Sequence, residues 1–235
     1  MGSFKQLPNL LARNPKIIEA FEANSDIKSI DELLQSTVFL SGSEQILIID
    51  KTGKVISSSK LISGKSIEKN IHPDEPYVQA ALNGRLGYFY AVDKQTLART
   101  IFIARGIYTS SLSPQGVVII KVDVPTLEYQ WNVDDISLAF FDANNVAFIT
   151  NRPSMALRRI GALDKPFLET KHYEKNQISK FVDYKKSMLL NHTIYKFFNT
   201  EELPKEALPR DNINFKSSKL ELLAQTHVLE LISGI

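Results

Sequence analysis

The strongest constraint on the fold is an apolar run that ends at a proline, GVVIIKVDVPTLEYQW, residues 116–131. Strand alternation over Val117–Val124 places Lys121 and Asp123 on one face together with apolar side chains. Pro125 suits the first turn of a helix, because it has no N–H that would need an intrahelical partner. The run therefore predicts a mostly buried strand that presents one lysine and passes directly into a helical connector. Spacing alone favours a solvated Lys121 on a half-exposed strand.

A second feature is a hairpin pattern that occurs twice, in residues 46–59 and 138–151. Each copy has four apolar residues, an aspartate (Asp50 or Asp142), a turn and a β-rich return. The first turn carries a glycine and the second an asparagine, and both residues tolerate a positive φ. The pattern predicts two related antiparallel modules. The alternative is that two unrelated hairpins look alike.

The N-terminal region has several helix signals. Asn14 can cap a helix that begins at Pro15, and Ser29 with Glu32 has the spacing of a capping box. Gly42 is a plausible helix stop. We therefore expect this region to be largely helical.

Between the two hairpins we expect one short helix and three further strands, at residues 76–83, 88–92, 98–108 and 117–124. With the first hairpin they give a module of about five strands. The second module is predicted to be shorter. Its stretch 171–210 is polar and weakly periodic, and residues 215–235 fit either two closing strands, which we favour, or a helix.

Composition excludes several classes of function. The chain has 235 residues, 43% of them hydrophobic, a net charge of +2 and no cysteine. The small charge argues against a nucleic-acid partner, and the missing thiols exclude disulfides and thiolate chemistry. The four histidines are scattered, and no nucleophile or phosphate-binding motif is complete. We expect no catalytic residue, metal or cofactor, and no apolar run reaches the length that spans a bilayer.

The first module holds most of the tyrosines together with several cations. Core packing explains most of these aromatics. The same residue types also build a small anion pocket, in which a few cationic and polar groups converge within apolar walls. The polar candidates are Lys94, Thr96, Arg99, Arg105 and Lys121.

These segments resemble the extracytoplasmic domain of the four-carbon-dicarboxylate sensor histidine kinases. That family carries a strand GVVVVKVDL, a helix LE..W and then V..TD..GV....SRP. Here GVVIIKVDVPTLEYQW precedes AFFDANNVAFITNRP. Upstream, LPNLLARNPKIIEAF, IIDKTGKVISSS and PYVQAALNGRLGYFYA resemble the family's first helix, its LLD..G..IASS segment and its PYF..A..G..G.YFA. The resemblance covers about residues 7 to 165.

The resemblance implies an α+β fold, with a long N-terminal helix followed by two tandem PAS-like (double Cache) antiparallel-sheet modules. It divides the chain into a helical region at 1–42, a membrane-distal ligand-binding module at 43–131 and a smaller membrane-proximal module at 132–235. It places this domain in the periplasm as part of an inner-membrane protein. The flanking transmembrane helices and a cytoplasmic histidine kinase would lie outside this sequence, so the fragment is not expected to be an enzyme. The family also implies a homodimer through the N-terminal helix.

The family's ligand contacts transfer first to Lys121, the lysine of its VVK strand. They transfer also to Lys94 and Thr96, where the family has a Thr/Ser-rich turn, and to Arg105 on the next strand. The resemblance therefore implies a small-molecule carboxylate in the distal module, with Lys121 as its principal contact.

The chain departs from the family at the motif Arg-Pro-Tyr-Phe and at the aromatic segment before it. Glu75 replaces the arginine next to Tyr77, and His72 lies in the preceding segment. An acid at a carboxylate contact removes a bidentate pair and adds a like charge. The ligand is then a dicarboxylate or related carboxylate, with Lys94 compensating, or a zwitterion held by Glu75 and Lys121.

Two other functions remain open. The altered residues near Glu75 favour a ligand-free domain or one that senses a partner protein. The domain could also sense an amino acid or amine and serve another output, such as a diguanylate cyclase or a chemoreceptor, because one fold serves several outputs.

Overall fold

The computed structural model describes residues 2–22, 27–62, 65–66, 69–129, 139–159, 166–180, 184–189 and 192–197. The chain divides into two compact units, and the division falls between Asp123 and Val124. The elements expected at residues 215–235 lie outside the described residues. The three-part division at 42 and 131 stays a prediction.

The N-terminal region is helical, as expected, and its helices are α1 (Gly2–Ala12), α2 (Pro15–Glu22) and α3 (Ile27–Ser41). The predicted start at Asn14 is confirmed, because its Oδ1 accepts the backbone N–H of Lys16 at 3.0 Å. The predicted stop at Gly42 is confirmed too: its φ is +70° and its N–H donates to the carbonyl of Val38. The predicted capping box is wrong, because α3 begins two residues before Ser29.

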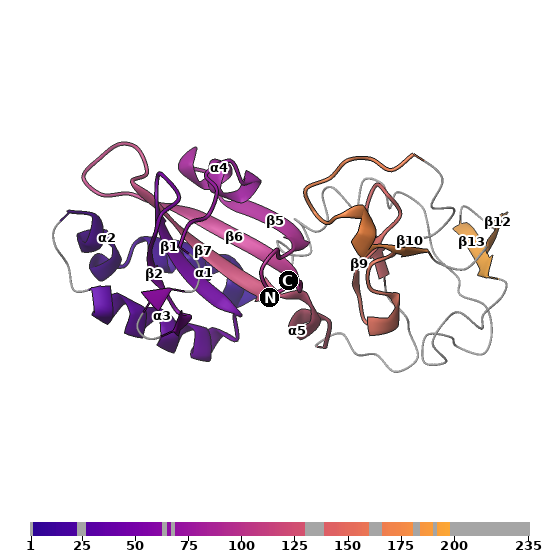
Figure 1. Ribbon diagram of the computed structural model, residues 1–235, viewed down its shortest axis with the longest axis horizontal. Helices are drawn as coiled ribbons and strands as arrows, with labels where there is room; N and C mark the ends of the chain where they lie inside the picture. Colours follow the sequence, from indigo (N-terminus) through magenta and orange to yellow (C-terminus); the bar gives the residue numbers. More distant parts are fainter. Residues whose placement is uncertain are drawn as a thin grey trace. The chain divides into compact units, whose positions relative to one another are not determined.

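The first unit contains a five-stranded antiparallel sheet in the order β2-β1-β7-β6-β5. Its strands are β1 (Gln45–Asp50), β2 (Val55–Ser58), β5 (Gly87–Val92), β6 (Arg99–Ile107) and β7 (Gly116–Asp123). The apolar run of the sequence is β7, which lies at the centre of the sheet because two neighbours cover its edges. Helix α4 (Pro76–Leu82) packs against β5, β6 and β7, whereas α1 contacts β6 and β7 and α3 contacts β1 and β2. Figure 1 shows α4 and the N-terminal helices on opposite faces of the sheet.

The face under α4 carries the core that adjoins the candidate site. Alternation puts Leu47, Phe102 and Ile119 on this face, where they pack with Tyr77 and Val78 of α4. These side chains are buried. Leu47 pairs with Ile119, and two residues further along the same strands Gln45 pairs with Lys121, so the polar residues of this face lie directly beside its apolar core.

The two hairpins predicted as a repeat have the same hydrogen-bond pattern. Strand β1 turns into β2 at Asp50, whose Oδ1 accepts the N–H groups of Thr52 and Lys54. Strand β8 (Ala139–Phe141) turns into β9 (Ala147–Thr150) at Asp142, whose Oδ1 accepts the N–H groups two and four residues ahead. The residue three after each aspartate has a positive φ, +90° and +57°. Each pair of strands also has a register shift before its aspartate.

The remaining described elements are short: β3 (Leu61–Ile62), β4 (Lys65–Ser66), α5 (Val124–Tyr129), η1 (Pro153–Met155), β10 (Arg158–Arg159), η2 (Lys175–Gln177), β11 (Ser179–Lys180), β12 (Tyr184–Leu189) and β13 (His192–Phe197). Within the second unit, Glu128 of α5 accepts the N–H of Thr150 at 2.6 Å. The predicted mixture of helices and antiparallel sheet is confirmed. The second tandem module stays a prediction. In the described part of the chain, no helix combines the length and the hydrophobicity needed to cross a bilayer.

Candidate functional site

The candidate site is built around Lys121, which lies two residues before the end of β7. In the sheet Lys121 lies between Gln45 of β1 and Phe102 of β6. Its side chain is buried, so the expectation of a solvated lysine is wrong. The reason is that β1 and β6 flank β7 on both sides, which a single strand pattern cannot show.

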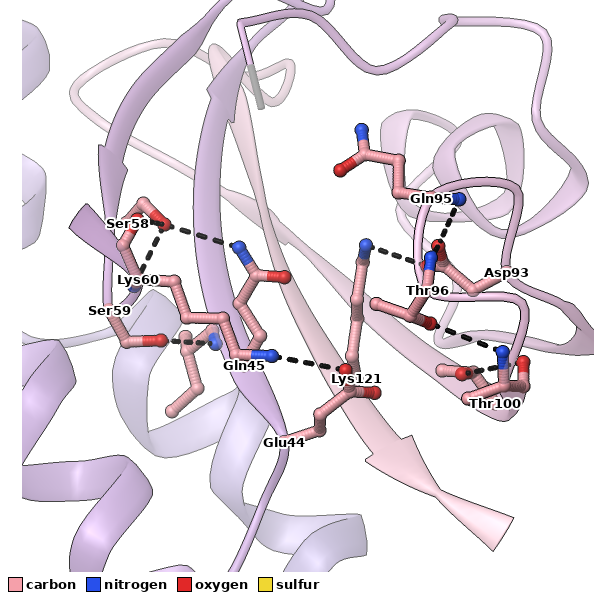
Figure 2. Close-up of polar contacts among 12 residues, drawn as sticks. Glu44, Gln45, Ser58, Ser59, Lys60, Asp93, Gln95, Thr96, Thr100 and Lys121 are labelled. Carbon is pink, nitrogen blue, oxygen red and sulfur yellow. Dashed lines mark hydrogen bonds and ion pairs between the residues drawn. The ribbon is translucent and has the colours of Figure 1, made fainter. Parts of the chain in front are cut away.

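The ammonium group of Lys121 forms an ion pair with Asp93, the residue directly after β5. Nζ lies 2.8 Å from Oδ2, and the two side chains are 3% and 4% exposed. Asp93 continues the alternation of Phe89 and Ala91, which places it on the face under α4. Figure 2 shows the lysine side chain extended toward this carboxylate across the end of the sheet.

Asp93 also organises the turn that joins β5 to β6. Its Oδ1 accepts the backbone N–H groups of Gln95 at 2.8 Å and Thr96 at 3.1 Å. Burial raises the pKa of Asp93, but the hydrogen bond and charge of Lys121 and these two N–H groups outweigh it, so the pKa lies below its ordinary value. Asp93 is therefore ionised at neutral pH. One oxygen holds the turn, and the other faces the lysine.

Other polar and aromatic groups surround the pair. The buried amide of Gln45 donates from Nε2 to the Ser58 hydroxyl at 3.3 Å (Figure 2). Nζ of Lys121 lies 5.7 Å from the ring centroid of Phe102, and that ring stacks on Tyr77 at 4.8 Å. A buried cation, a buried anion, an amide and a hydroxyl beside aromatic rings can recognise a small polar ion. The described residues contain no cluster of three or more potential metal ligands.

Lys94 and Glu75, both predicted site residues, lie at the surface of this region. Nζ of Lys94 is 3.9 Å from Oε1 of Glu75, and the side chains are 88% and 26% exposed. Glu75 is the residue before α4, where an acid favours the helix N-terminus. The pair therefore joins the start of α4 to the turn after β5, and does not share the burial of Lys121.

The other predicted site residues are placed differently. Tyr77 is buried in α4 over the sheet, whereas His72 is 70% exposed and its Nδ1 accepts the backbone N–H of Asp74 at 3.3 Å. Thr96 lies in the exposed turn, and its Oγ1 accepts the N–H of Ala98. Arg105 has the opposite orientation to Phe102 in β6, so the structure does not bring it together with Lys121; its Nη1 donates to the carbonyl of Gly84.

Sequence reasoning missed three residues of this cluster: Asp93, Gln45 and Ser58. The signal for Asp93 is present in the sequence, because Asp93 extends the alternation of β5 by one position, but the predicted strand ends at residue 92. Gln45 and Ser58 could be placed only through strand register, which the sequence does not state.

The fold is that of the PAS-like sensor domains. The sensor domain of the histidine kinase DctB from Vibrio cholerae superposes with a TM-score of 0.69 at 15% identity, over 86% of this chain and 80% of that domain. The ligand-binding domain of the Campylobacter jejuni chemoreceptor Tlp3, solved with L-valine, superposes with a TM-score of 0.52 at 15% identity, over 83% of this chain and 77% of that one.

At the level of sequence, the chain is homologous to the C4-dicarboxylate transport sensor protein DctB of Pseudomonas aeruginosa. The two are 23% identical over 152 residues, which is 63% of this chain and 25% of that protein. The chain thus spans about a quarter of the length of that relative. No family model matches it. The resemblance to the extracytoplasmic Cache-type sensors of the C4-dicarboxylate kinases is confirmed.

Proposed function

We propose that this chain is the periplasmic sensor domain of an inner-membrane two-component histidine kinase, and that it binds a small carboxylate in its first unit. Lys121 is the group that contacts the carboxylate. The kinase and the membrane anchors belong to sequence outside this chain, and the domain itself is not an enzyme. The homology to a C4-dicarboxylate sensor protein supports this proposal.

The observation that carries the proposal is the burial of Lys121. An ammonium group is expensive to remove from water unless a paired anion compensates it. Packing of this face needs no charge, because Leu47, Phe102 and Ile119 already supply an apolar core around Lys121. A buried lysine in a sensor fold is therefore best explained by a task in binding, and a carboxylate is the partner that matches its charge.

Signal output is proposed to follow from the connection of β7 to α5. Lys121 lies three residues before Val124, where the strand passes into the helix without a loop. A ligand that binds Lys121 more tightly in one conformation shifts the population of the domain toward it. The displacement of β7 would then be passed to α5 through the backbone.

A thermal-shift panel of small carboxylates and amino acids tests the binding site. A ligand at about 100 times its Kd adds about 2.7 kcal/mol to the free energy of unfolding. At this chain length that raises Tm by about 5 to 10 °C. Lys121→Met is expected to abolish the ligand shift, whereas the matched control Lys94→Met, at an 88% exposed lysine, keeps it. A Lys121→Met variant that binds as well as the parent would rule out this site.

One observation favours a second function, a ligand-free or partner-sensing domain. Lys121 already has a carboxylate partner within the chain, at 2.8 Å. If no compound in the panel changes Tm, the pair of Lys121 and Asp93 is structural. The domain then senses a partner protein or has no ligand.

We further propose a homodimer through the N-terminal helices. Phe39 and Leu40 at the end of α3 are 87% and 83% exposed. Light scattering after gel filtration is expected to give twice the chain mass of 26.5 kDa. Phe39→Lys should then lower it to one chain mass, and a monomeric parent would contradict the proposal.

A further inference from the structure

We infer that the ligand is a zwitterion: its carboxylate binds Lys121 and its ammonium group binds Asp93. The inference rests on the proposed function, because it requires the ligand at Lys121. Beyond the proposed carboxylate, the inference specifies that the ligand carries an ammonium group and that Asp93 recognises this group.

The geometry of the ion pair is the first argument. Nζ of Lys121 and Oδ2 of Asp93 are in direct contact at 2.8 Å, and both side chains are more than nine-tenths buried. The ammonium group has three N–H donors, so a carboxylate that binds Nζ lies beside the Asp93 oxygen or takes its place. In either case Asp93 shares the charge of the lysine with a second anion or loses it, and a buried carboxylate that is less well compensated is unfavourable.

The charge of the ligand decides whether Asp93 finds that partner. A zwitterion exchanges one internal ion pair for two, since its carboxylate meets the lysine and its ammonium group meets the aspartate. A dicarboxylate satisfies only the lysine and adds a second negative charge beside Asp93. Like charges in a desolvated site discriminate against that ligand. The buried pair therefore selects for a ligand with one charge of each sign.

The position of Asp93 in its turn is the second argument. Oδ1 is held by the N–H groups of Gln95 and Thr96, so the carboxylate stays anchored when Oδ2 loses the lysine. The turn residues Lys94 to Leu97 are exposed, so Asp93 lies directly beneath the surface of the unit. Asp93 can therefore present Oδ2 to an entering ammonium group without unfolding of the sheet.

Three further charged groups near the turn have contacts of their own. The half-buried Glu75 and the exposed Lys94 form a pair of zero net charge. Arg105 has the opposite orientation in β6 and donates to Gly84. The recognition of an ammonium group thus falls to Asp93 rather than to Glu75, the acid that the sequence suggested for it.

Isothermal titration of the full 235-residue chain with matched ligands tests the inference. The four-carbon set is 4-aminobutyrate, succinate and butyrate, and the three-carbon set is 3-aminopropanoate, malonate and propanoate. An amino acid is expected to bind, with the dicarboxylate of equal length about a hundredfold weaker or more. Butyrate and propanoate, which lack a second charge, should bind with an affinity between those of the amino acid and the dicarboxylate. Because this comparison uses the parent protein, it does not depend on the folding of a variant.

Two variants identify the residue that is responsible. Asp93→Asn keeps an oxygen for the turn but removes the charge, so it should lose the preference for the amino acid over the dicarboxylate. Asp50→Asn is the matched control, since Asp50 caps the β1–β2 turn in the same way and should leave the preference unchanged.

Failure of the inference and failure of the proposed function give different results. If a dicarboxylate binds as tightly as the amino acid and Lys121→Met removes that binding, the carboxylate site stands and the zwitterion is overturned. If an amino acid binds and Asp93→Asn keeps the same preference, Asp93 does not recognise the amine. If nothing in either set binds, both are overturned.

Discussion

At the scale of single residues, Lys121 and Asp93 form an ion pair in which both side chains are almost completely buried. Removal of one partner leaves a charge in a place where water cannot reach it. Lys121→Met is therefore expected to lower the free energy of unfolding by about 3 to 5 kcal/mol. The double variant Lys121→Met/Asp93→Asn removes both charges and should recover part of that loss. Urea unfolding of the four proteins measures the coupling, and additive losses would contradict it.

The lowered pKa of Asp93 makes a separate prediction about pH. An aspartate with a lower pKa in the folded state stabilises the fold above its unfolded pKa, which is about 3.9, and loses this contribution as the pH falls through the folded value. The stability difference between the parent and Asp93→Asn should thus be constant from about pH 7 to pH 5 and shrink below about pH 4.

The pH experiment has an internal comparison in Asp50. Burial raises its pKa too, but the hydrogen bonds from Thr52 and Lys54 lower it on balance. Asp50→Asn should show the same sign of pH dependence without involving Lys121. If the difference in stability between the parent and Asp93→Asn stays constant down to pH 2.5, the carboxylate of Asp93 is not paired in the folded state.

At this scale the sequence points to Lys121 but not to its surroundings. Its place after Ile119 and Ile120 depends only on neighbours in the chain, and it matches the lysine of the VVK strand in the family that the chain resembles. Its burial and its contact with Asp93 depend on the pairing of β5, β6 and β7, which join residues 28 positions apart. The alternation of side chains can be read from the sequence of one strand, whereas the register between two strands is known only from the structure.

At the scale of elements, the repeated hairpin is the feature that sequence and structure share most closely. Both turns use an aspartate that accepts N–H groups two and four residues ahead, and both have a positive φ at the third residue. Such turns depend on local chemistry, so the sequence predicts them well. The N-terminal helices were predicted for the same reason, through Asn14 and Gly42. The start of α3 was not, because a Ser/Glu spacing also occurs inside helices.

Two glycines, Gly42 and Gly53, allow the cost of a positive φ to be measured with and without a steric overlap. Gly42 has a φ of +70° with open space around an added Cβ, so Gly42→Ala should cost about 1 to 2 kcal/mol. Gly53 has a φ of +90°, and an added Cβ would also overlap the carbonyl oxygen of Ile71. Gly53→Ala should therefore be clearly more destabilising in urea unfolding. Equal losses of unfolding free energy in the two variants would mean that the backbone at Ile71 moves away from the added Cβ at no cost.

At the scale of the whole molecule, the sequence predicts the class of the protein better than its ligand. The motifs around β7 lead to the C4-dicarboxylate sensors, and the fold and the homology agree. The ligand is harder to predict because, in the proposed site, it depends on a few side chains of the first unit. Two of them, Glu75 and Asp93, carry charges opposite to those that a dicarboxylate site needs.

The most direct test of the central claim is a crystal structure of the chain with the ligand that raises Tm most in the panel. We predict that a carboxylate oxygen of this ligand lies within hydrogen-bond distance of Nζ of Lys121, on the face of the sheet under α4. Oδ2 of Asp93 should no longer contact that nitrogen. A ligand bound elsewhere in the chain, with the Lys121–Asp93 pair still closed at 2.8 Å, would contradict the account.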